Sequence, residues 1–139
     1  MEGKLVVISG FSGAGKGTVI RRLMEQNKGY ALSVSMTTRQ PRKGETDGVE
    51  YHFVKNEVFE ELIRQDGFLE HAGYVDHYYG TPRAFVEENM AASRNVLLEI
   101  EVQGAMQIRM PTRKKSDKYC RCNIFHSGMF GRLNVTCNG

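Results

Sequence analysis

The sequence predicts an α/β domain built around a mainly parallel sheet, and three observations support this fold class. The apolar run at residues 5–9 is rich in β-branched residues and typical of a strand buried on both faces, and residues 96–102 predict a second strong strand. Apolar residues recur at helical spacing in segments between these runs. A glycine-rich turn joins the first strand directly to the first helix. Strands that alternate with helices indicate parallel pairing through helical crossovers.

The elements follow one another in a regular order. The strand at residues 5–9 leads through the turn into a helix at about residues 17–26. Segments bounded by glycine or polar residues predict further strands at residues 31–36, 49–54 and 68–75.

Capping residues place two more helices. Asn56 is expected to cap the start of the second helix, and Gly67 to end it. The third helix is expected to begin at Thr81-Pro82, because a capping residue followed by proline marks a helix start. The apolar faces of the three helices are predicted to consist of Val19, Ile20, Leu23 and Met24, of Val58, Phe59, Leu62 and Ile63, and of Phe85, Val86 and Met90.

The composition is that of an ordinary globular domain. The chain has 139 residues, of which 40% are hydrophobic and 25% charged. No apolar run approaches the roughly 18 residues of a membrane span. The first residues pass straight into a strand and leave no room for a signal peptide. We therefore expect a cytoplasmic protein without a membrane partner.

The stretch GFSGAGKGT at residues 10–18 predicts a phosphate-binding loop. Glycines allow positive φ values that turn successive N–H groups toward one point, and the following helix adds its positive end. Lys16 supplies a cation for the β- and γ-phosphates, and Gly17 stands where the motif calls for a hydroxyl. Thr18 is expected to act through its N–H, with Mg²⁺ held mainly by nucleotide oxygens and water. A glycine-rich turn with an exposed lysine is the alternative. The predicted ATP-binding residues are Gly10, Phe11, Ser12, Gly13, Ala14, Gly15, Lys16, Gly17 and Thr18.

A second group of motifs resembles one family. SVSMTTRQPRKGETDGVEYHF at residues 33–53 resembles the GMP-binding segment of guanylate kinases, with its S-x-x-T-T-R-x-P-R and G-x-x-Y pattern. FLEHA, YYGTP and LLEIEVQGA match the same family in the same order, so the resemblance covers residues 4 to about 109. It implies a P-loop kinase with a parallel sheet core in a domain at residues 1–109. It also implies a small, inserted, β-rich GMP-binding subdomain at about residues 33–82.

The resemblance also implies roles for single residues. Arg39 and Arg42 match the arginines that bind the GMP phosphate, and planar guanidinium forks suit a phosphate dianion. With Lys16 they are the predicted catalytic residues. Glu70 matches the carboxylate that accepts hydrogen bonds from guanine N1–H and its exocyclic amine. The other implied GMP contacts are Ser35, Tyr51, Tyr79, Thr81 and Glu101.

Several of these residues also allow a simpler interpretation. The two arginines could form a solvated basic loop, and Thr81 and Ser35 could serve a helix cap and a turn. Glu99 and Glu101 lie two apart in the strand predicted at residues 96–102, so both are expected on one face. The resemblance places Glu99 where an acidic residue helps to position Mg²⁺. Because glutamate is longer than the family's usual aspartate, contact through water is the alternative to direct contact.

The implied reaction is ATP + GMP giving ADP + GDP, with Mg²⁺ as cofactor and without nucleic acid as a partner. Two rival functions stay open at this point. One is another P-loop nucleoside monophosphate kinase, against which the guanine-binding Glu70 argues. The other is a guanylate-kinase-like module that binds a protein ligand, against which the intact loop argues. The sequence does not indicate an oligomeric state.

Residues 110–139 differ from the rest of the chain. Residues 1–109 carry 13 Lys+Arg and 15 Asp+Glu, whereas residues 110–139 carry 6 and 1 and all three cysteines. We expect a frameshifted or disordered non-family tail in place of the family's lid and last core elements. The first strand would then lack a neighbour on one side, and turnover would be low. A basic nucleic-acid-binding tail or a zinc site is the alternative, the latter formed by Cys120, Cys122, His126 and Cys137.

Overall fold

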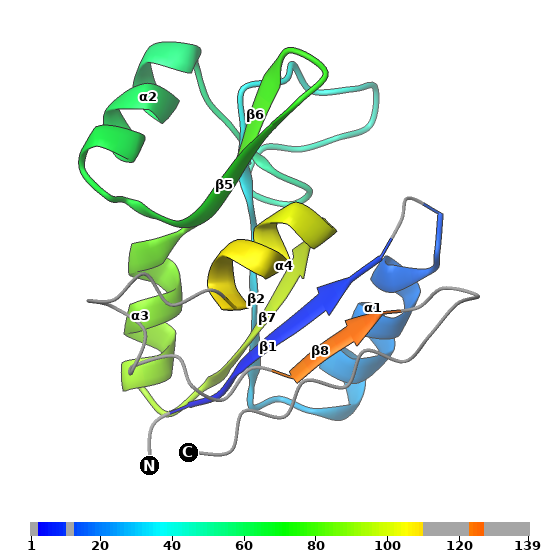
Figure 1. Cartoon of the computed structure of the whole chain (residues 1–139). Helices are drawn as coiled ribbons and strands as arrows, with labels where there is room; N and C mark the ends of the chain where they lie inside the picture. The colour runs from blue at the N-terminus through cyan, green and yellow to red at the C-terminus, as the bar shows by residue number, and fades with distance from the viewer. Residues whose placement is uncertain (1–2, 11–12, 110–122, 127–139) are drawn as a thin grey trace.

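Four parallel strands form the main sheet of the computed structural model, which describes residues 3–10, 13–109 and 123–126. Their order is β2 (Tyr30–Ser33), β7 (Asn95–Ile100), β1 (Leu5–Ser9) and β8 (Asn123–His126). This sheet and its helices confirm the predicted α/β class (Figure 1). The predictions for Phe11, Ser12, Cys120, Cys122 and Cys137 lie outside the described residues.

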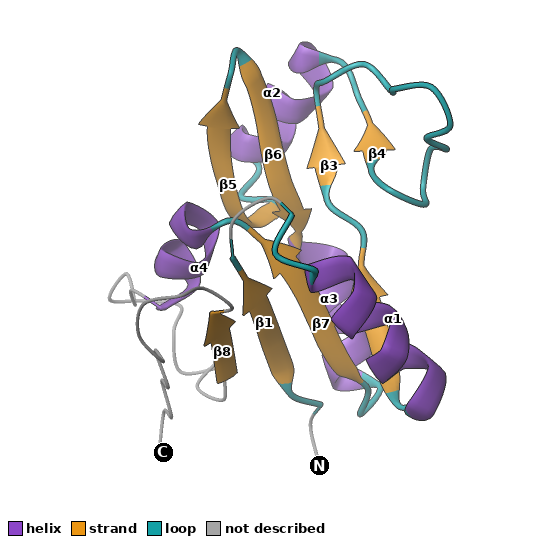
Figure 2. Ribbon diagram, turned by 90° about the vertical axis from the view of Figure 1, so that its right-hand side faces the viewer, coloured by secondary structure: helices purple, strands orange, loops and turns teal. Residues whose placement is uncertain are grey.

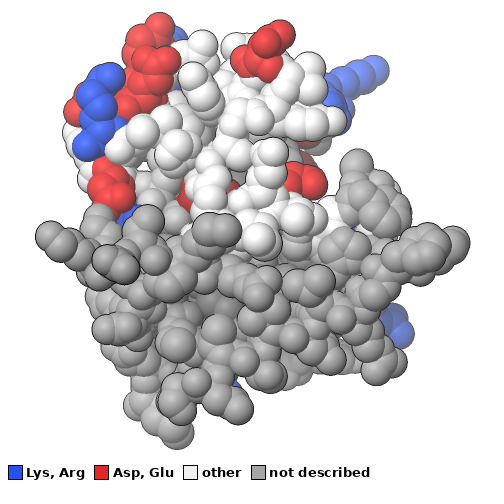
Figure 3. All heavy atoms as spheres, viewed as in Figure 1, with Lys and Arg blue, Asp and Glu red and all other residues white. Residues whose placement is uncertain are grey.

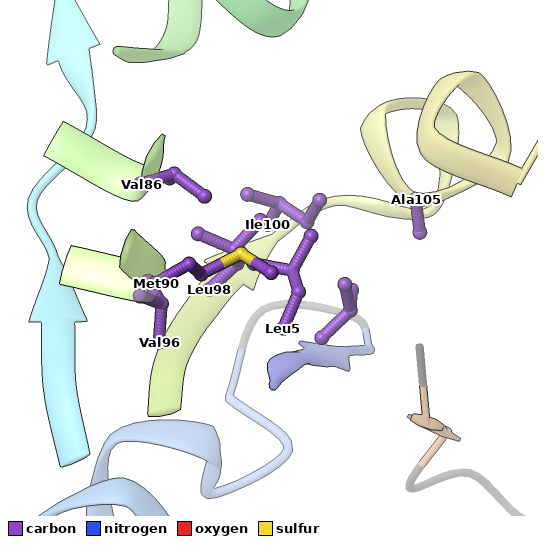
Figure 4. Packing of buried hydrophobic residues seen from close by; sticks show 8 residues of the cluster. Leu5, Val86, Met90, Val96, Leu98, Ile100 and Ala105 are labelled. Carbon is purple, nitrogen blue, oxygen red and sulfur yellow. The ribbon is translucent and has the colours of Figure 1, made fainter. Parts of the chain in front are cut away.

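Helices cover both faces of the main sheet. On one face, α3 (Arg83–Ala91) and α4 (Val102–Arg109) pack on alternate residues of β1 and β7. Figure 4 shows this cluster, with Met90 beside Leu98 and Ile100. On the other face, α1 (Lys16–Gln26) places Ile20 against Ile8 and Leu97. Burial on both faces explains the near-continuous apolar sequence of β1 and β7.

A second sheet is inserted between β2 and α3. Its order is β4 (His52–Phe53), β3 (Met36–Thr37), β6 (His77–Pro82) and β5 (Phe68–Tyr74). The helix α2 (Asn56–Arg64) packs on it through Phe59, whose ring stacks at 4.3 Å on Phe68 and at 5.3 Å on Tyr78. The strands of the main sheet point toward this second sheet (Figure 2). The inserted β-rich subdomain is therefore confirmed.

The outer surface of α2, which covers the second sheet, is highly charged (Figure 3). Figure 3 shows side chains of both signs over α2. There Arg64 and Glu61 form an exposed ion pair of 2.6 Å. Such a surface is typical of a solvated helix face. No helix in the described ranges is long and apolar enough to cross a membrane.

Three strand predictions are wrong in detail. Residues 31–36 form two strands in different sheets, because the chain leaves the main sheet after Ser33 and enters the second at Met36. Residues 49–54 contribute only His52–Phe53, since residues 48–50 form a turn in which the Val49 N–H donates to the Thr46 carbonyl at 3.1 Å. The strand at 96–102 ends at Ile100, because Val102 begins α4. The sequence reasoning did not predict β6 or α4.

Two capping predictions are also wrong. The N-cap of α2 is Lys55 rather than Asn56. Gly67 does lie at the end of this helix, because its N–H donates to the Leu62 carbonyl at 2.8 Å, although Asp66 rather than Gly67 takes the left-handed conformation (φ 55°). Thr81 lies in β6 and makes no cap, so α3 follows Pro82. Three side chains predicted on apolar faces are exposed: Val19, Val58 and Phe85.

β1 has a strand on each side, contrary to the expectation of a missing neighbour. Residues 6–9 of β1 pair in parallel with β8, and the other edge of β1 pairs with β7. The phosphate-loop strand is therefore internal to the sheet. The predicted boundary near residue 109 stays a prediction.

The turn between β5 and β6 is strained, and this predicts a stabilising substitution. Val75 and Asp76 have φ values of 46° and 61° between the paired residues Tyr74 and His77. A β-branched residue is poorly suited to this region, which costs an ordinary residue about 1–2 kcal/mol. We expect Val75→Asn to raise the free energy of unfolding by about 1 kcal/mol in urea titrations. Val49→Asn is the control, at an exposed valine without positive φ. Equal effects of both substitutions would contradict the strain argument.

Candidate functional site

The phosphate-loop candidate joins the carboxyl end of β1 to α1. Gly13 and Gly15 have φ values of 82° and 83°, and Gly15 is the N-cap of α1. The N–H groups of Thr18 and Val19 donate to the Gly15 carbonyl, which begins the helix. A Cβ at either glycine would meet no atom within 4 Å, so backbone conformation rather than crowding requires glycine there. The first turn of a helix is a ready anion site.

Lys16 lies across the start of this loop. Its Nζ donates a 2.7 Å hydrogen bond to the Gly10 carbonyl, which brings the cation back toward the end of β1. Thr18 is exposed in the first turn of α1. Gly17 has neither a positive φ nor a close neighbour, so its backbone does not require glycine. The described part of the loop, with Ala14, therefore joins a strand to a helix as expected, and its binding of phosphate stays a prediction.

Glu99 and Glu101 are placed differently from one another. Glu99 pairs in register with Ile8 of β1, near the edge of the sheet from which the loop emerges, and is exposed. Glu101 lies beyond the end of β7, where its carbonyl accepts the Ala105 N–H of α4. The prediction that both lie on one face of a strand is therefore wrong. No hydrogen bond within the described ranges joins the Glu101 side chain to the other predicted guanine contacts.

Arg39 is held by a carboxylate that the sequence reasoning missed. Its Nη1 and Nη2 donate to Glu45 Oε2 and Oε1 at 2.9 and 3.0 Å. The Arg42 N–H donates to the same carboxylate at 2.7 Å, while the Arg42 side chain is exposed. The pKa of Glu45 is lowered to about 2, first by the Arg39 hydrogen bond and then by the Arg42 backbone. The pair fixes the guanidinium plane by a bidentate contact.

Aromatic rings surround this guanidinium. Arg39 Cζ lies 5.4 Å from the centroid of Tyr51 and 5.7 Å from that of Phe53, within cation–π range. Tyr51 and Tyr79 make an edge contact at 5.8 Å. Burial raises the pKa of Tyr51, and the charges of Tyr79 and Glu99 act in the same direction. The structure therefore brings Arg39, Tyr51 and Tyr79 together, and Glu99 lies close enough for its charge to affect the pKa of Tyr51.

Glu70 is a buried carboxylate with one side-chain donor. It is only 6% exposed, and the Thr81 hydroxyl donates to its Oε1 at 2.6 Å. Burial raises the pKa of Glu70 above its ordinary value, and the hydrogen bonds from Thr81 oppose this shift. Thr81 thus serves the carboxylate rather than a helix cap. Ser35 lies between β2 and β3, where its carbonyl accepts the His52 N–H at 2.9 Å.

β6 connects these two groups. Tyr79 and Thr81 lie two residues apart on this strand, so their side chains point to the same face. Tyr79 belongs to the Arg39 group, and Thr81 is paired with Glu70 on the neighbouring strand β5. One planar molecule with an anionic end could therefore contact both groups at once. The described residues contain no cluster of three metal-ligating side chains.

The comparisons with known proteins point to one family. The family model described as guanylate kinase matches residues 2–116, which is most of the chain. The chain belongs to the guanylate kinase family.

Three relatives illustrate the likeness to guanylate kinases. The guanylate kinase of Latilactobacillus sakei is 57% identical over 109 residues, covering 78% of this chain and 54% of that protein. A guanylate kinase of Thermus thermophilus is 56% identical over 109 residues, with coverages of 78% and 49%. A crystal structure of guanylate kinase from Anaplasma phagocytophilum superposes with a TM-score of 0.72 at 33% identity, covering 90% of this chain and 60% of that one. The chain spans about half the length of the curated relatives it matches.

The missed partner Glu45 predicts a pH dependence of stability for this member of the guanylate kinase family. Its pKa is lowered in the fold, so the ion pair stabilises the fold above pH 4.5 and loses this effect as pH falls toward about 2. Near neutral pH we expect the wild type to have a higher melting temperature than Glu45→Gln. This difference in melting temperature is expected to vanish toward pH 2. Glu60→Gln, at an exposed residue of α2, is the control. A difference that persists undiminished at pH 2 would contradict this role of the charge.

Proposed function

We propose that this chain binds GMP and ATP and transfers the γ-phosphoryl group of ATP to GMP, giving ADP and GDP. The observation that carries the proposal is the strand β6, which places Tyr79 of the Arg39 group beside Thr81 of the Glu70 pair. The Glu70 carboxylate has the acceptor oxygens that the guanine base requires, and the Arg39 group has the cation and hydroxyl groups that the phosphate requires. Family membership supports the same reaction.

The acceptor half would use the second sheet. The two oxygens of the Glu70 carboxylate would accept hydrogen bonds side by side from guanine N1–H and its exocyclic amine. Adenine has no N1–H, so AMP would leave a buried acceptor unpaired. Arg39, Tyr51 and Tyr79 would bind the phosphate, together with the exposed side chain of Arg42. Ser35 and Glu101 remain proposed guanine contacts.

The donor half would use the loop at the end of β1. Its backbone N–H groups and the positive end of α1 would hold the phosphates of ATP. Lys16 would exchange its bond to the Gly10 carbonyl for the β- and γ-phosphates. The carboxyl ends of the main strands point toward the second sheet (Figure 2), so the two nucleotides would meet between the two sheets.

Mg²⁺ would bind together with ATP, coordinated mainly by the nucleotide rather than by protein side chains. Guanylate kinases are nucleotide kinases that generally use Mg²⁺ with ATP. The described residues offer no group of three ligands, and the exposed Glu99 pairs in register with Ile8, near the end of β1. Glu99 would hold the hydrated ion through water. When bound, Mg²⁺ neutralises charge on the transferring phosphates.

The chain's residues would act by alignment and charge neutralisation. The acceptor is already an anionic phosphate, so no general base is needed. Lys16, Arg39 and Arg42 would hold donor and acceptor in line and offset the charge that develops between them. The cytoplasmic location, the absence of nucleic-acid and membrane partners and the low turnover stay predictions.

Phosphoryl transfer by the purified 139-residue chain tests the proposal. We expect GDP to form from GMP in the presence of ATP and Mg²⁺, and far less transfer to AMP. Equal use of AMP would indicate another nucleoside monophosphate kinase. Failure to bind ATP, together with no GDP, would indicate a non-catalytic module instead.

A further inference from the structure

α4 holds the strand that carries Glu70. It lies between the main sheet and the β5–β6 hairpin (Figure 1). The side chain of Gln107 makes two hydrogen bonds with the backbone of His71: its Oε1 accepts the N–H at 3.1 Å, and its Nε2 donates to the carbonyl at 2.7 Å. β5 is an edge strand of the second sheet in the described chain. The amide of Gln107 thus replaces a neighbouring strand at the residue next to Glu70.

Gly104 faces the Glu70 carboxylate directly. A Cβ at this position would overlap Glu70 Oε2 and would lie 2.8 Å from its Cδ and 3.3 Å from its Cγ. The three nearest atoms all belong to Glu70, so the carboxylate itself excludes a side chain here. The other oxygen, Oε1, is fixed by Thr81. The carboxylate is therefore held between a hydroxyl on β6 and the bare backbone of α4.

Helix propensity does not explain this glycine. Gly104 is the third residue of α4, and glycine in a helix costs about 1 kcal/mol relative to alanine. Its φ is not left-handed, so alanine could adopt the same backbone conformation. The space for the carboxylate is the remaining structural reason for glycine at this position.

We propose that Gly104 and Gln107 are positioning residues that set the location of the Glu70 carboxylate and thereby the selectivity for guanine. This inference deepens the proposed function and rests on it. Gly104 provides the space in which the carboxylate lies. Gln107 fixes the position of β5 relative to α4 through its two hydrogen bonds to the His71 backbone. A side chain at residue 104 pushes the carboxylate out of line with the base, whereas ATP binding uses other residues and is unaffected.

The test compares Gly104→Ala with Gln103→Ala, an exposed neighbour on the same helix. Calorimetric titration of the full chain is expected to show GMP binding weakened about tenfold by Gly104→Ala, with ATP binding unchanged. Discrimination between GMP and AMP falls with it. Gln103→Ala binds GMP as the wild type does. Wild-type GMP affinity and selectivity in Gly104→Ala overturns the inference.

A second readout does not depend on GMP. Carbon NMR of the side-chain carboxyl is expected to show the raised pKa of Glu70 moving toward its ordinary value in Gly104→Ala, because the displaced group gains solvent. Gln107→Leu is expected to speed hydrogen exchange of the His71 N–H at least about tenfold. Should the wild type fail to bind GMP, the proposed function fails, yet these two measurements still decide the positioning. An unchanged Glu70 titration in Gly104→Ala, or an unchanged His71 exchange in Gln107→Leu, overturns it.

Discussion

Replacement of Lys16 by alanine is expected to abolish phosphoryl transfer from ATP. Lys16 is the cation of the loop, and its Nζ already lies over the turn in contact with the Gly10 carbonyl. A hydrogen bond to a charged group contributes about 1.5–3 kcal/mol, so ATP binding alone is expected to fall by about ten- to a hundredfold. Loss of charge neutralisation during transfer adds to this effect. Transfer assays and calorimetry with ATP measure the two contributions separately.

Arg39→Ala is the reciprocal variant. Arg39 lies in the second sheet's loop, paired with Glu45 and next to Tyr51, far along the chain from the phosphate loop. We expect it to weaken GMP binding and raise the Michaelis constant for GMP, while ATP binding stays near the wild-type value.

For the first variant, near-normal turnover by Lys16→Ala would show that the loop between β1 and α1 does not bind the transferred phosphates.

Glu70→Gln is expected to remove guanine recognition while keeping the shape of the site. The Thr81 hydroxyl can still donate to the remaining side-chain oxygen, so the fold is preserved. The new amide nitrogen is a donor that faces the donors of guanine, which costs about 1–3 kcal/mol. GMP affinity should therefore fall by roughly ten- to a hundredfold, with ATP binding little changed.

Calorimetric titration with each nucleotide checks this expectation. Glu60→Gln removes a carboxylate from the exposed surface of α2 and serves as the control for lost charge. Because Glu70 is buried and its pKa is raised, GMP affinity of the wild type is also expected to fall on acidification at a pH above the ordinary value for a glutamate. Equal GMP affinity of Glu70→Gln and wild type would reject the assignment of Glu70 to guanine.

Local pattern was sufficient for the elements of the main sheet. The bounds of β1 follow from a run of five residues that are apolar except for its last, Ser9, and α1 begins within one residue of its predicted start. Glu70 lies in the inserted sheet and the two arginines lie in a loop that follows its strand β3, as the order of the motifs suggests. In each case the signal lies within a few consecutive residues, so it can be read without knowledge of the rest of the fold.

The elements that were missed depend on contacts distant in sequence. β6 follows a turn of Val75 and Asp76, which lacks the asparagine or glycine that marks a hairpin. Gln107 is fixed by the backbone of His71, 36 residues away, and nothing in the local sequence of α4 indicates this pairing. Glu45 could have been noticed as a carboxylate within a basic loop. Its bidentate contact with Arg39, however, requires the folded turn.

The central claim is that the second sheet recognises a guanine nucleotide, and a paired calorimetric titration of the 139-residue chain with GMP and AMP tests it most directly. Saturable binding of one GMP per chain is expected, with AMP at least about tenfold weaker, because only guanine matches the two acceptor oxygens of Glu70. The discrimination is expected to disappear in Glu70→Gln. Equal affinity for GMP and AMP, or no binding of GMP at all, would contradict the claim.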